Sequence, residues 1–273
     1  MSRKKLFWFS CLIFFAYVAV AVFAPLIAPY DPYTVSGPPL RQPDSMHPLG
    51  TNATGQDILS QLIFGTRITL IIGLGAALIS CSISVSLGIL TGYYGGAFDG
   101  IVMRGIDIFM TIPLFPLLLV LTLFFTPGIF LVAILMGVLG STHSVRVFRS
   151  QVMGIRNASF IEGARAIGSR DMRIMSHHIL PNLIPIVTVR FVSSVLHYIL
   201  LGVGLSFLGL GDPMVIDWGQ MIEQAYSSGG FALGLWWWLI PPGLAVVGLS
   251  LALAHLGYSS EEFYNPRLEK NRY

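Results

Sequence analysis

The sequence predicts an all-α integral membrane protein with about six transmembrane helices, and three observations lead to this fold class. First, 54% of its 273 residues are hydrophobic and 11% are charged, whereas soluble domains carry roughly 25% charged residues. Second, uncharged stretches long enough to cross a bilayer recur along the chain. Third, lysine and arginine gather in alternate segments between these stretches. This composition excludes a water-soluble globule, and two cysteines are too few for a disulfide scaffold.

Five uncharged stretches hold the expected spans. The first, Leu6 to Ala28, is longer than the apolar core of a secretory signal peptide, which has roughly 7–15 residues, so we expect an uncleaved helix. The stretch from Ile108 to Val145 holds two spans, because Thr126-Pro127-Gly128 near its middle predicts the turn of a helical hairpin. The other spans are expected at about Ile68 to Gly92, Pro185 to Leu208 and Leu233 to Gly257.

The basic residues orient the chain, because cytoplasmic loops hold the excess of lysine and arginine. Only Arg41 and Arg67 fall outside if the N-terminus is inside. Arg190 lies one or two turns into the fifth span, from where its side chain can extend back to the inner surface. We therefore expect both termini in the cytoplasm. The inner segments then hold Arg3, Lys4, Lys5, Arg104, Arg146, Arg149, Arg156, Arg165, Arg170, Arg173, Arg267, Lys270 and Arg272.

These features divide the chain into segments. Residues 1–28 form an N-terminal tail and the first helix, 29–66 an extracytoplasmic segment, 67–257 the transmembrane core with a cytoplasmic loop at 146–182, and 258–273 a cytoplasmic tail.

The two outer segments differ in character. The first is rich in proline, and its part Asp57 to Phe64 has apolar residues at helical spacing, so we expect a helix along the membrane surface there. The loop from Asp212 to about Phe231 contains Asp212, Asp217 and Glu223 and no basic residue. It is either a solvated outer loop or an acidic patch for a cationic substrate or partner.

The cytoplasmic loop carries a short amphipathic helix. In Ser159-Phe160-Ile161-Glu162 the serine hydroxyl and the glutamate carboxylate can each accept from a backbone N–H of the first turn, which is a capping box. We therefore expect a helix that begins at Ser159. One apolar stripe is formed by Phe160, Ile161, Ala164 and Ile167. Such a stripe suits a helix that docks on a partner or one that rests on lipid headgroups.

This helix is expected to end at Gly168, because a left-handed residue commonly follows a helix and glycine adopts that conformation readily. Ser169 with Asp171 can then cap a second helix, which we expect to stop before Pro181.

The run Glu162-Gly163-Ala164-Arg165-Ala166-Ile167-Gly168, followed by Ile179-Leu180-Pro181-Asn182, closely resembles the EAA loop of bacterial ABC importer permeases. That loop reads Glu-Ala-Ala, three residues and Gly, with Leu-Pro further on, so the spacing is specific. Other motifs resemble the C-type permease subunit of the dipeptide, oligopeptide and nickel family. They are His47-Pro48-Leu49-Gly50-Thr51, Tyr93-Tyr94-Gly95-Gly96, Leu205-Ser206-Phe207-Leu208-Gly209-Leu210-Gly211, Trp218-Gly219 and Asn265-Pro266-Arg267-Leu268.

This resemblance implies an ABC type I importer permease fold in the cytoplasmic (inner) membrane of a bacterium or archaeon. The implied partners are a second homologous permease subunit, two cytoplasmic ABC ATPase subunits, an extracytoplasmic solute-binding protein and membrane lipid, with no nucleic acid. The EAA helix would sit in a groove of the ATPase and couple ATP binding to movement of the spans. The residues implied for coupling are Glu162, Gly163, Ala164, Arg165, Ala166, Gly168, Leu180 and Pro181, with Ser159 as the helix cap.

The chain itself has no motif for ATP. It lacks Gly-x-x-x-x-Gly-Lys-Ser/Thr, and its only lysines are Lys4, Lys5 and Lys270, so ATP and Mg belong to the partner ATPase subunits and no cofactor is expected here. We expect the cargo to be di- or oligopeptides, with nickel or a metal chelate as the alternative. A membrane-embedded enzyme is a remote alternative, because its motifs are missing, and a channel would not need a docking helix.

The chain departs from the family pattern at two places. Gly163 stands where the family has alanine, and glycine inside a helix costs roughly 0.5–1 kcal/mol relative to alanine. Asn52, Gln56 and Gln61 stand where the family usually has Asp, Arg and Arg. A possible ion pair is therefore replaced on both sides by neutral amides.

Several polar or distinctive residues lie near or within the spans. Asp107 is expected to pair with Arg104, three residues earlier on the same helix face. His143, His197 and His255 are candidates for nickel or a proton, although no two have metal-ligand spacing in the sequence. Close helix approach is expected at Gly202, Gly204, Gly209 and Gly211, and an interfacial aromatic belt at Trp236, Trp237 and Trp238.

Overall fold

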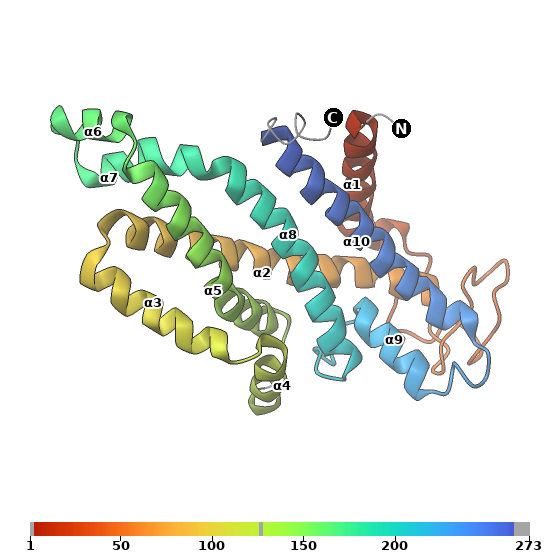
Figure 1. The fold of residues 1–273 in the computed structure, drawn as a ribbon. Helices are drawn as coiled ribbons and strands as arrows, with labels where there is room; N and C mark the ends of the chain where they lie inside the picture. The colour runs from red at the N-terminus through yellow and green to blue at the C-terminus, as the bar shows by residue number, and fades with distance from the viewer. Residues whose placement is uncertain (1–2, 126–127, 265–273) are drawn as a thin grey trace.

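The computed structural model describes residues 3–125 and 128–264, and these residues are nearly all helical (Figure 1). The helices are α1 (Arg3–Ile27), α2 (Ile58–Tyr94), α3 (Gly96–Thr111), α4 (Leu114–Phe124), α5 (Ile129–Arg156), α6 (Ser159–Ala166), α7 (Asp171–Ile174), α8 (Leu180–Phe207), α9 (Trp218–Ser227) and α10 (Trp236–Tyr264). A π-helical turn, Met175–Ile179, joins α7 to α8. The predicted all-α class is confirmed, since the described part of the chain contains one isolated β-bridge and no strand.

Five helical stretches are long and apolar enough to cross a membrane, and a sixth span exists if α3 and α4 count as one. These two helices meet at an angle of 84°. The break falls at Ile112, which precedes Pro113 and has extended backbone angles (φ −95°, ψ 123°), because a residue before proline is disfavoured in the helical region. The prediction of about six spans is therefore confirmed.

The third span begins earlier than predicted. Helix α3 begins at Gly96 and not near Ile108, and it includes Asp99 and Asp107. Both carboxylates pair with arginines of α5. These charged residues therefore lie inside the helix, whereas the sequence analysis had used them to place its start. The predicted turn at Thr126-Pro127 lies outside the described residues, and Gly128 directly precedes α5.

Helix α2 is continuous over 37 residues, so the separate surface helix predicted from Asp57 to Phe64 is wrong. Asp57 caps its start, accepting from the backbone N–H of Ser60 at 2.8 Å, and Ile58 is fully buried. α5 and α8 pack against α2 in the middle of the molecule (Figure 1). The approach to α8 is close, because a Cβ added at Gly73 would lie 2.3 Å from Ile199 Cγ1.

The helix that follows Gly168 was predicted to stop before Pro181. It instead continues from Asp171 to Phe207 as one stretch. The N–H of Leu180 donates to the carbonyl of Met175, five residues back. This wider turn precedes Pro181, whose ring lacks an N–H and would crowd an ordinary helical turn. The proline therefore lies within a helix that the sequence analysis had divided.

The loop predicted at Asp212 to Phe231 contains a helix, α9, packed against α8 and α10. Asp217 is 2% exposed and caps α9, accepting from the N–H groups of Gly219 and Gln220 and from the Ser206 hydroxyl. Burial raises the pKa of the Asp217 carboxyl, and these three donors oppose the rise. Asp217 therefore caps a helix and, because it is buried, does not contribute to an acidic patch on the surface.

The predicted aromatic belt and the predicted sites of close helix approach are each confirmed only for some of their residues. Trp236 is exposed, but Trp237 and Trp238 are 5% and 1% exposed and belong to the main core, so only Trp236 suits an interfacial belt. Gly202 does face another helix, because a Cβ there would lie 3.3 Å from Ile72 Cγ2. Gly209 has no neighbour of this kind and instead adopts φ +78° just after α8.

The three amides that replace the family's charged residues form a connected cluster. The Asn52 side-chain amide donates to Gln56 Oε1 at 2.8 Å and to Gln61 Oε1 at 3.4 Å. The Gln61 amide donates to Gln56 Oε1 at 2.8 Å. Because the neutral amides satisfy one another, the replacement of the three charged residues leaves no unpaired charge within this cluster.

Candidate functional site

The first candidate site is the segment from α6 to the start of α8. Helix α6 begins at Ser159, as predicted, but the predicted capping box is wrong. Ala158 occupies the N-cap position (φ −77°, ψ 144°), and no side chain caps the helix. Glu162 is exposed in the first turn, where its negative charge is still favourable beside the partial positive charge of a helix N-terminus.

The end of α6 is as predicted. Gly168 has φ +80°, the left-handed conformation that glycine adopts without strain. The N–H of Ser169 donates to the carbonyl of Ala164 at 3.0 Å and that of Gly168 donates to Arg165 at 2.9 Å. These bonds satisfy carbonyls at the end of the helix and turn the chain sharply into α7.

The apolar stripe of α6 is divided between two surfaces. Ile161 and Ala164 are buried in a small core with Val152 of α5 and Ile174 and Ile179 of the α7 region. Phe160 and Ile167 are 48% and 84% exposed. The sequence predicted one stripe, but the buried half anchors α6 to its own chain and only the exposed half is free to meet a partner.

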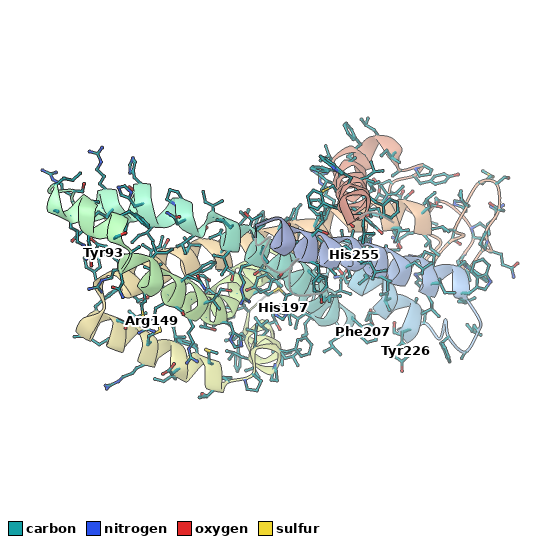
Figure 2. All side chains as sticks on the ribbon, turned by 45° about the horizontal axis from the view of Figure 1, so that its top comes forward. Tyr93, Arg149, His197, Phe207, Tyr226 and His255 are labelled. Carbon is teal, nitrogen blue, oxygen red and sulfur yellow. The ribbon has the colours of Figure 1, made fainter. Side chains whose placement is uncertain are left out.

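A polar cluster joins α6 to two other helices. Tyr93, at the end of α2 (Figure 2), donates its hydroxyl to Asp171 of α7 at 2.5 Å. The Arg165 guanidinium lies 5.3 Å from the centre of the Tyr93 ring, within the range of a cation–π interaction. Arg165 therefore has a partner in its own chain, which the sequence analysis did not predict.

The remaining residues implied for coupling are mostly exposed. Gly163 and Ala166 lie on the outer side of α6, and a Cβ at Gly163 would meet nothing within 4 Å. Leu180 and Pro181 are exposed at the start of α8, and the ring of the nearby His178 lies 6.4 Å from that of Phe160.

A hollow of about 590 Å³ lies between the end of α6 and the α7 region. It is lined by Ile167, Gly168, Ser169, Arg170, Arg173 and His178, and holds no acidic side chain among these residues.

Two ion pairs link α3 to α5. Arg149 donates to both carboxylate oxygens of Asp99 at 2.5 Å, and Arg146 pairs with Asp107. The predicted partner of Asp107, Arg104, was therefore wrong, because the α3 carboxylate is directed across to α5 and not along its own helix.

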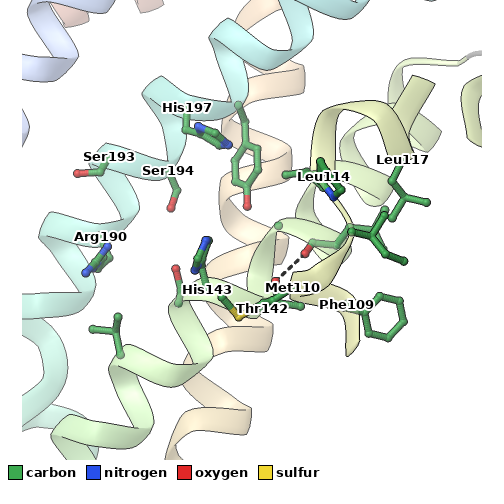
Figure 3. A pocket seen from close by; sticks show the side chains of 17 residues that line it. Phe109, Met110, Leu114, Leu117, Thr142, His143, Arg190, Ser193, Ser194 and His197 are labelled. Carbon is green, nitrogen blue, oxygen red and sulfur yellow. Dashed lines mark hydrogen bonds between the residues drawn. The ribbon is translucent and has the colours of Figure 1, made fainter. Parts of the chain in front are cut away.

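The second candidate site is a cavity of about 600 Å³ between the α3–α4 pair, α5 and α8 (Figure 3). Ile112, Pro113, Leu114 and Leu117 contribute an apolar wall. The opposite wall is polar and includes Thr142, His143 and Ser144 of α5 and Arg190, Ser193, Ser194 and His197 of α8. Arg190 thus lines the cavity, whereas the sequence analysis directed it to the inner surface.

The structure brings His143 and His197 to one cavity, whereas His255 lies on α10 (Figures 2 and 3). Within the described ranges no group of three His, Cys, Asp or Glu residues could hold a metal ion. The sequence could have indicated the polar wall, because Arg190, Ser193, Ser194 and His197 follow the i, i+3, i+4, i+7 spacing of one helix face. The cavity's apolar wall depends on the break between α3 and α4 and was not predicted.

A bundle of membrane-spanning helices around a polar cavity is typical of membrane transport proteins, and similarity to known sequences defines the family. Residues 84–270 match the family described as binding-protein-dependent transport system inner membrane component, and residues 1–48 match the N-terminal TM domain of oligopeptide transport permease C. The chain belongs to this family of permeases, which are transport components and not enzymes.

Similar proteins carry names of peptide transporters. The chain is 32% identical over 268 residues to the dipeptide transport system permease protein DppC of Haemophilus influenzae, covering 95% of this chain and 90% of that one. It is 31% identical to a putative peptide permease protein of Brucella suis, covering 90% and 82%. It is also 31% identical to the glutathione transport system permease protein GsiD of Pectobacterium atrosepticum, covering 92% and 84%.

Proposed function

We propose that this chain forms half of the translocation pathway of an ATP-driven importer of di- or oligopeptides. The names of the similar proteins, which specify dipeptides, peptides and glutathione, support this class of cargo. A second, homologous permease subunit forms the other half. Two ATPase subunits and an extracytoplasmic solute-binding protein complete the complex, and the ATPase subunits bind ATP and Mg.

One observation carries the proposal: a polar face is exposed within the spans. Arg190, Ser193 and His197 of α8 and His143 of α5 are all exposed in this chain. Charged and polar side chains inside a membrane face a bundle interior or a water-filled path and not lipid. A second permease subunit would cover this face, and the cavity of about 600 Å³ would open onto the path between them.

We further propose that α6 is the coupling helix and docks on an ATPase subunit. Its inner side, Ile161 and Ala164, is fixed to α5 and α7, so a push on the outer side reaches the spans. The outer side offers Phe160 and Ile167 to an apolar groove. The adjacent hollow carries Arg170 and Arg173, which would favour an acidic rim on the ATPase.

The proposed orientation places both termini and α6 in the cytoplasm of a bacterium or archaeon. The start of α1, the end of α10 and the α6–α7 region all lie along the upper edge of Figure 1, away from α9. This arrangement agrees with the arginine distribution.

The test is uptake by proteoliposomes that contain the complete complex. Loaded binding protein is added on the outer side, and ATP on the ATPase side, with radiolabelled alanyl-alanine, a longer peptide or nickel as the cargo. We expect uptake of a peptide that depends on ATP hydrolysis. Uptake of nickel with no uptake of either peptide would contradict the proposed cargo.

A further inference from the structure

The polar wall of the cavity is basic. Its titratable groups include Arg190 and His197 on α8 and His143, which reaches from α5 towards α8 (Figure 3). None of the described residues that line the cavity is an aspartate or a glutamate. The two acids of α3, Asp99 and Asp107, are already paired with arginines of α5.

Arg190 lies deep along its helix. It is ten residues after Leu180, the first residue of α8, which corresponds to about 15 Å along the axis, and His197 lies about 10 Å further. Arginine stays protonated at every physiological pH and offers its guanidinium N–H groups in a planar fork that fits a carboxylate. A permanent cation within a span therefore needs an anion that the cavity lining does not supply.

We propose that this cavity binds the terminal carboxylate of a peptide in transit, with the guanidinium of Arg190 as the main donor and His143 and His197 as further donors. This inference rests on the proposed function. The apolar wall, Ile112, Leu114 and Leu117, receives the adjacent side chain of the peptide. A cavity of about 600 Å³ is within the range of sites that hold small molecules.

A carboxylate of the second permease subunit is the competing partner for Arg190. The shape of the site favours the cargo, because one apolar wall and one basic wall match a molecule with an apolar side chain and one anionic end. A fixed ion pair between subunits would need no cavity. Binding should depend on the charge of the peptide if Arg190 holds the cargo, and should not depend on it if Arg190 pairs with the second subunit.

The first experiment measures binding without transport. Ser194 lines the cavity and its side chain is directed towards His143 (Figure 3), so Ser194→Cys, in a complex lacking Cys11 and Cys81, reports access by its rate of alkylation. We expect alanyl-alanine to slow the alkylation and alanyl-alanine amide to do so at concentrations at least about tenfold higher, the factor that one charge-assisted hydrogen bond supplies.

Arg190→Gln should weaken protection by the peptide to the level of the amide while protection by the amide stays unchanged, and Arg190→Lys should keep part of the difference. Arg104→Gln is the matched control, because Arg104 is exposed on α3 and does not line the cavity. Equal protection by peptide and amide in the unsubstituted complex, or an unchanged difference in Arg190→Gln, would overturn the proposal. If the Arg190→Gln complex loses protection by peptide and by amide to the same extent, the carboxylate site is overturned. Arg190 would then form an ion pair with the second permease subunit.

The second experiment separates this inference from the proposed function. Uptake of alanyl-alanine is measured in Arg190→Gln and Arg104→Gln complexes at saturating loaded binding protein. We expect at least about a tenfold loss in the first and little change in the second. Peptide uptake without protection of Ser194→Cys would leave the importer standing and overturn the carboxylate site. Protection without any peptide uptake would leave the site standing and contradict the importer.

Discussion

Asp57 joins the segment that precedes α2 to the start of this helix through three hydrogen bonds. One carboxylate oxygen accepts from the N–H and hydroxyl of Ser60, at 2.8 and 2.7 Å. The other oxygen lies 2.9 Å from Nδ1 of His47, and both side chains are almost completely buried. One residue therefore caps a helix and fixes the loop that precedes it.

Asp57→Ala should lower the stability of the protein by about 2–4 kcal/mol. Loss of an N-cap accounts for roughly 1 kcal/mol, and the unpaired buried imidazole of His47 for about 1–3 kcal/mol more. The measurement is thermal unfolding of the detergent-solubilised protein. Asp31→Ala is the control, because Asp31 is exposed and should cost less than about 0.5 kcal/mol. Equal shifts for the two variants would contradict this role.

Gly168 tests the coupling helix at a single residue. Nothing lies within 4 Å of a Cβ added there, so only its backbone angle, φ +80°, opposes substitution. Gly168→Val should strain the turn and lower uptake and cargo-stimulated ATP hydrolysis together, whereas Gly168→Asn should retain most of both, because asparagine tolerates the left-handed conformation. The readout is ATPase activity of the reconstituted complex with and without loaded binding protein. Full stimulation in Gly168→Val would show that this segment is only a surface loop.

At the scale of elements, α6 and α7 depend on the end of α2. Tyr93→Phe keeps the ring beneath Arg165 but removes the hydrogen bond to Asp171, which is worth roughly 1–2 kcal/mol for a partly buried charged acceptor. We expect fewer peptides imported per ATP hydrolysed, because the helix moves less firmly with the spans. Tyr94→Phe is the control, since Tyr94 is 49% exposed. An unchanged ratio of uptake to hydrolysis in Tyr93→Phe would remove Tyr93 from the coupling path.

Local signals predicted the elements well where the residue acts on its own backbone. Gly168 ends α6 because of its own φ, and the first apolar run predicted both ends of α1 to within about three residues. Helix α10 begins close to its predicted start but continues past Gly257 to Tyr264. The predictions failed where a distant partner decided the outcome. Asp107 bonds across to Arg146 of α5, which is 39 residues away in the sequence.

Contacts between residues that are distant in the sequence also explain why the candidate sites were predicted only in part. The exposed residues of α6 were predictable from the motif, whereas the inward position of Ile161 depends on Val152 and Ile179, which the fold brings together. The i, i+3, i+4, i+7 polar stripe on α8 was visible in the sequence. The cavity that this stripe lines could not be predicted, because only the bend between α3 and α4 places an apolar wall opposite Arg190.

At the scale of the molecule, the proposed orientation can be tested by chemical labelling. Cysteines are placed singly at Ser176, next to α7, and at Ala53, in the segment before α2; both positions are exposed. In a background without Cys11 and Cys81, a membrane-impermeant thiol reagent applied to intact cells should label Ala53→Cys and leave Ser176→Cys unlabelled until lysis. The reverse pattern would invert the molecule in the membrane.

Helix α2 connects the two ends of the protein without a break. Its 37 residues span about 55 Å, from the Asp57 cap to Tyr93 beneath Arg165. A stiff rod of this length that tilts by roughly 10° about its middle carries each end about 5 Å in opposite directions. A rigid tilt of α2 would therefore convert a displacement at one end of the helix into an opposite displacement at the other end. Gly73, with its close neighbour Ile199, lies near the middle of the helix.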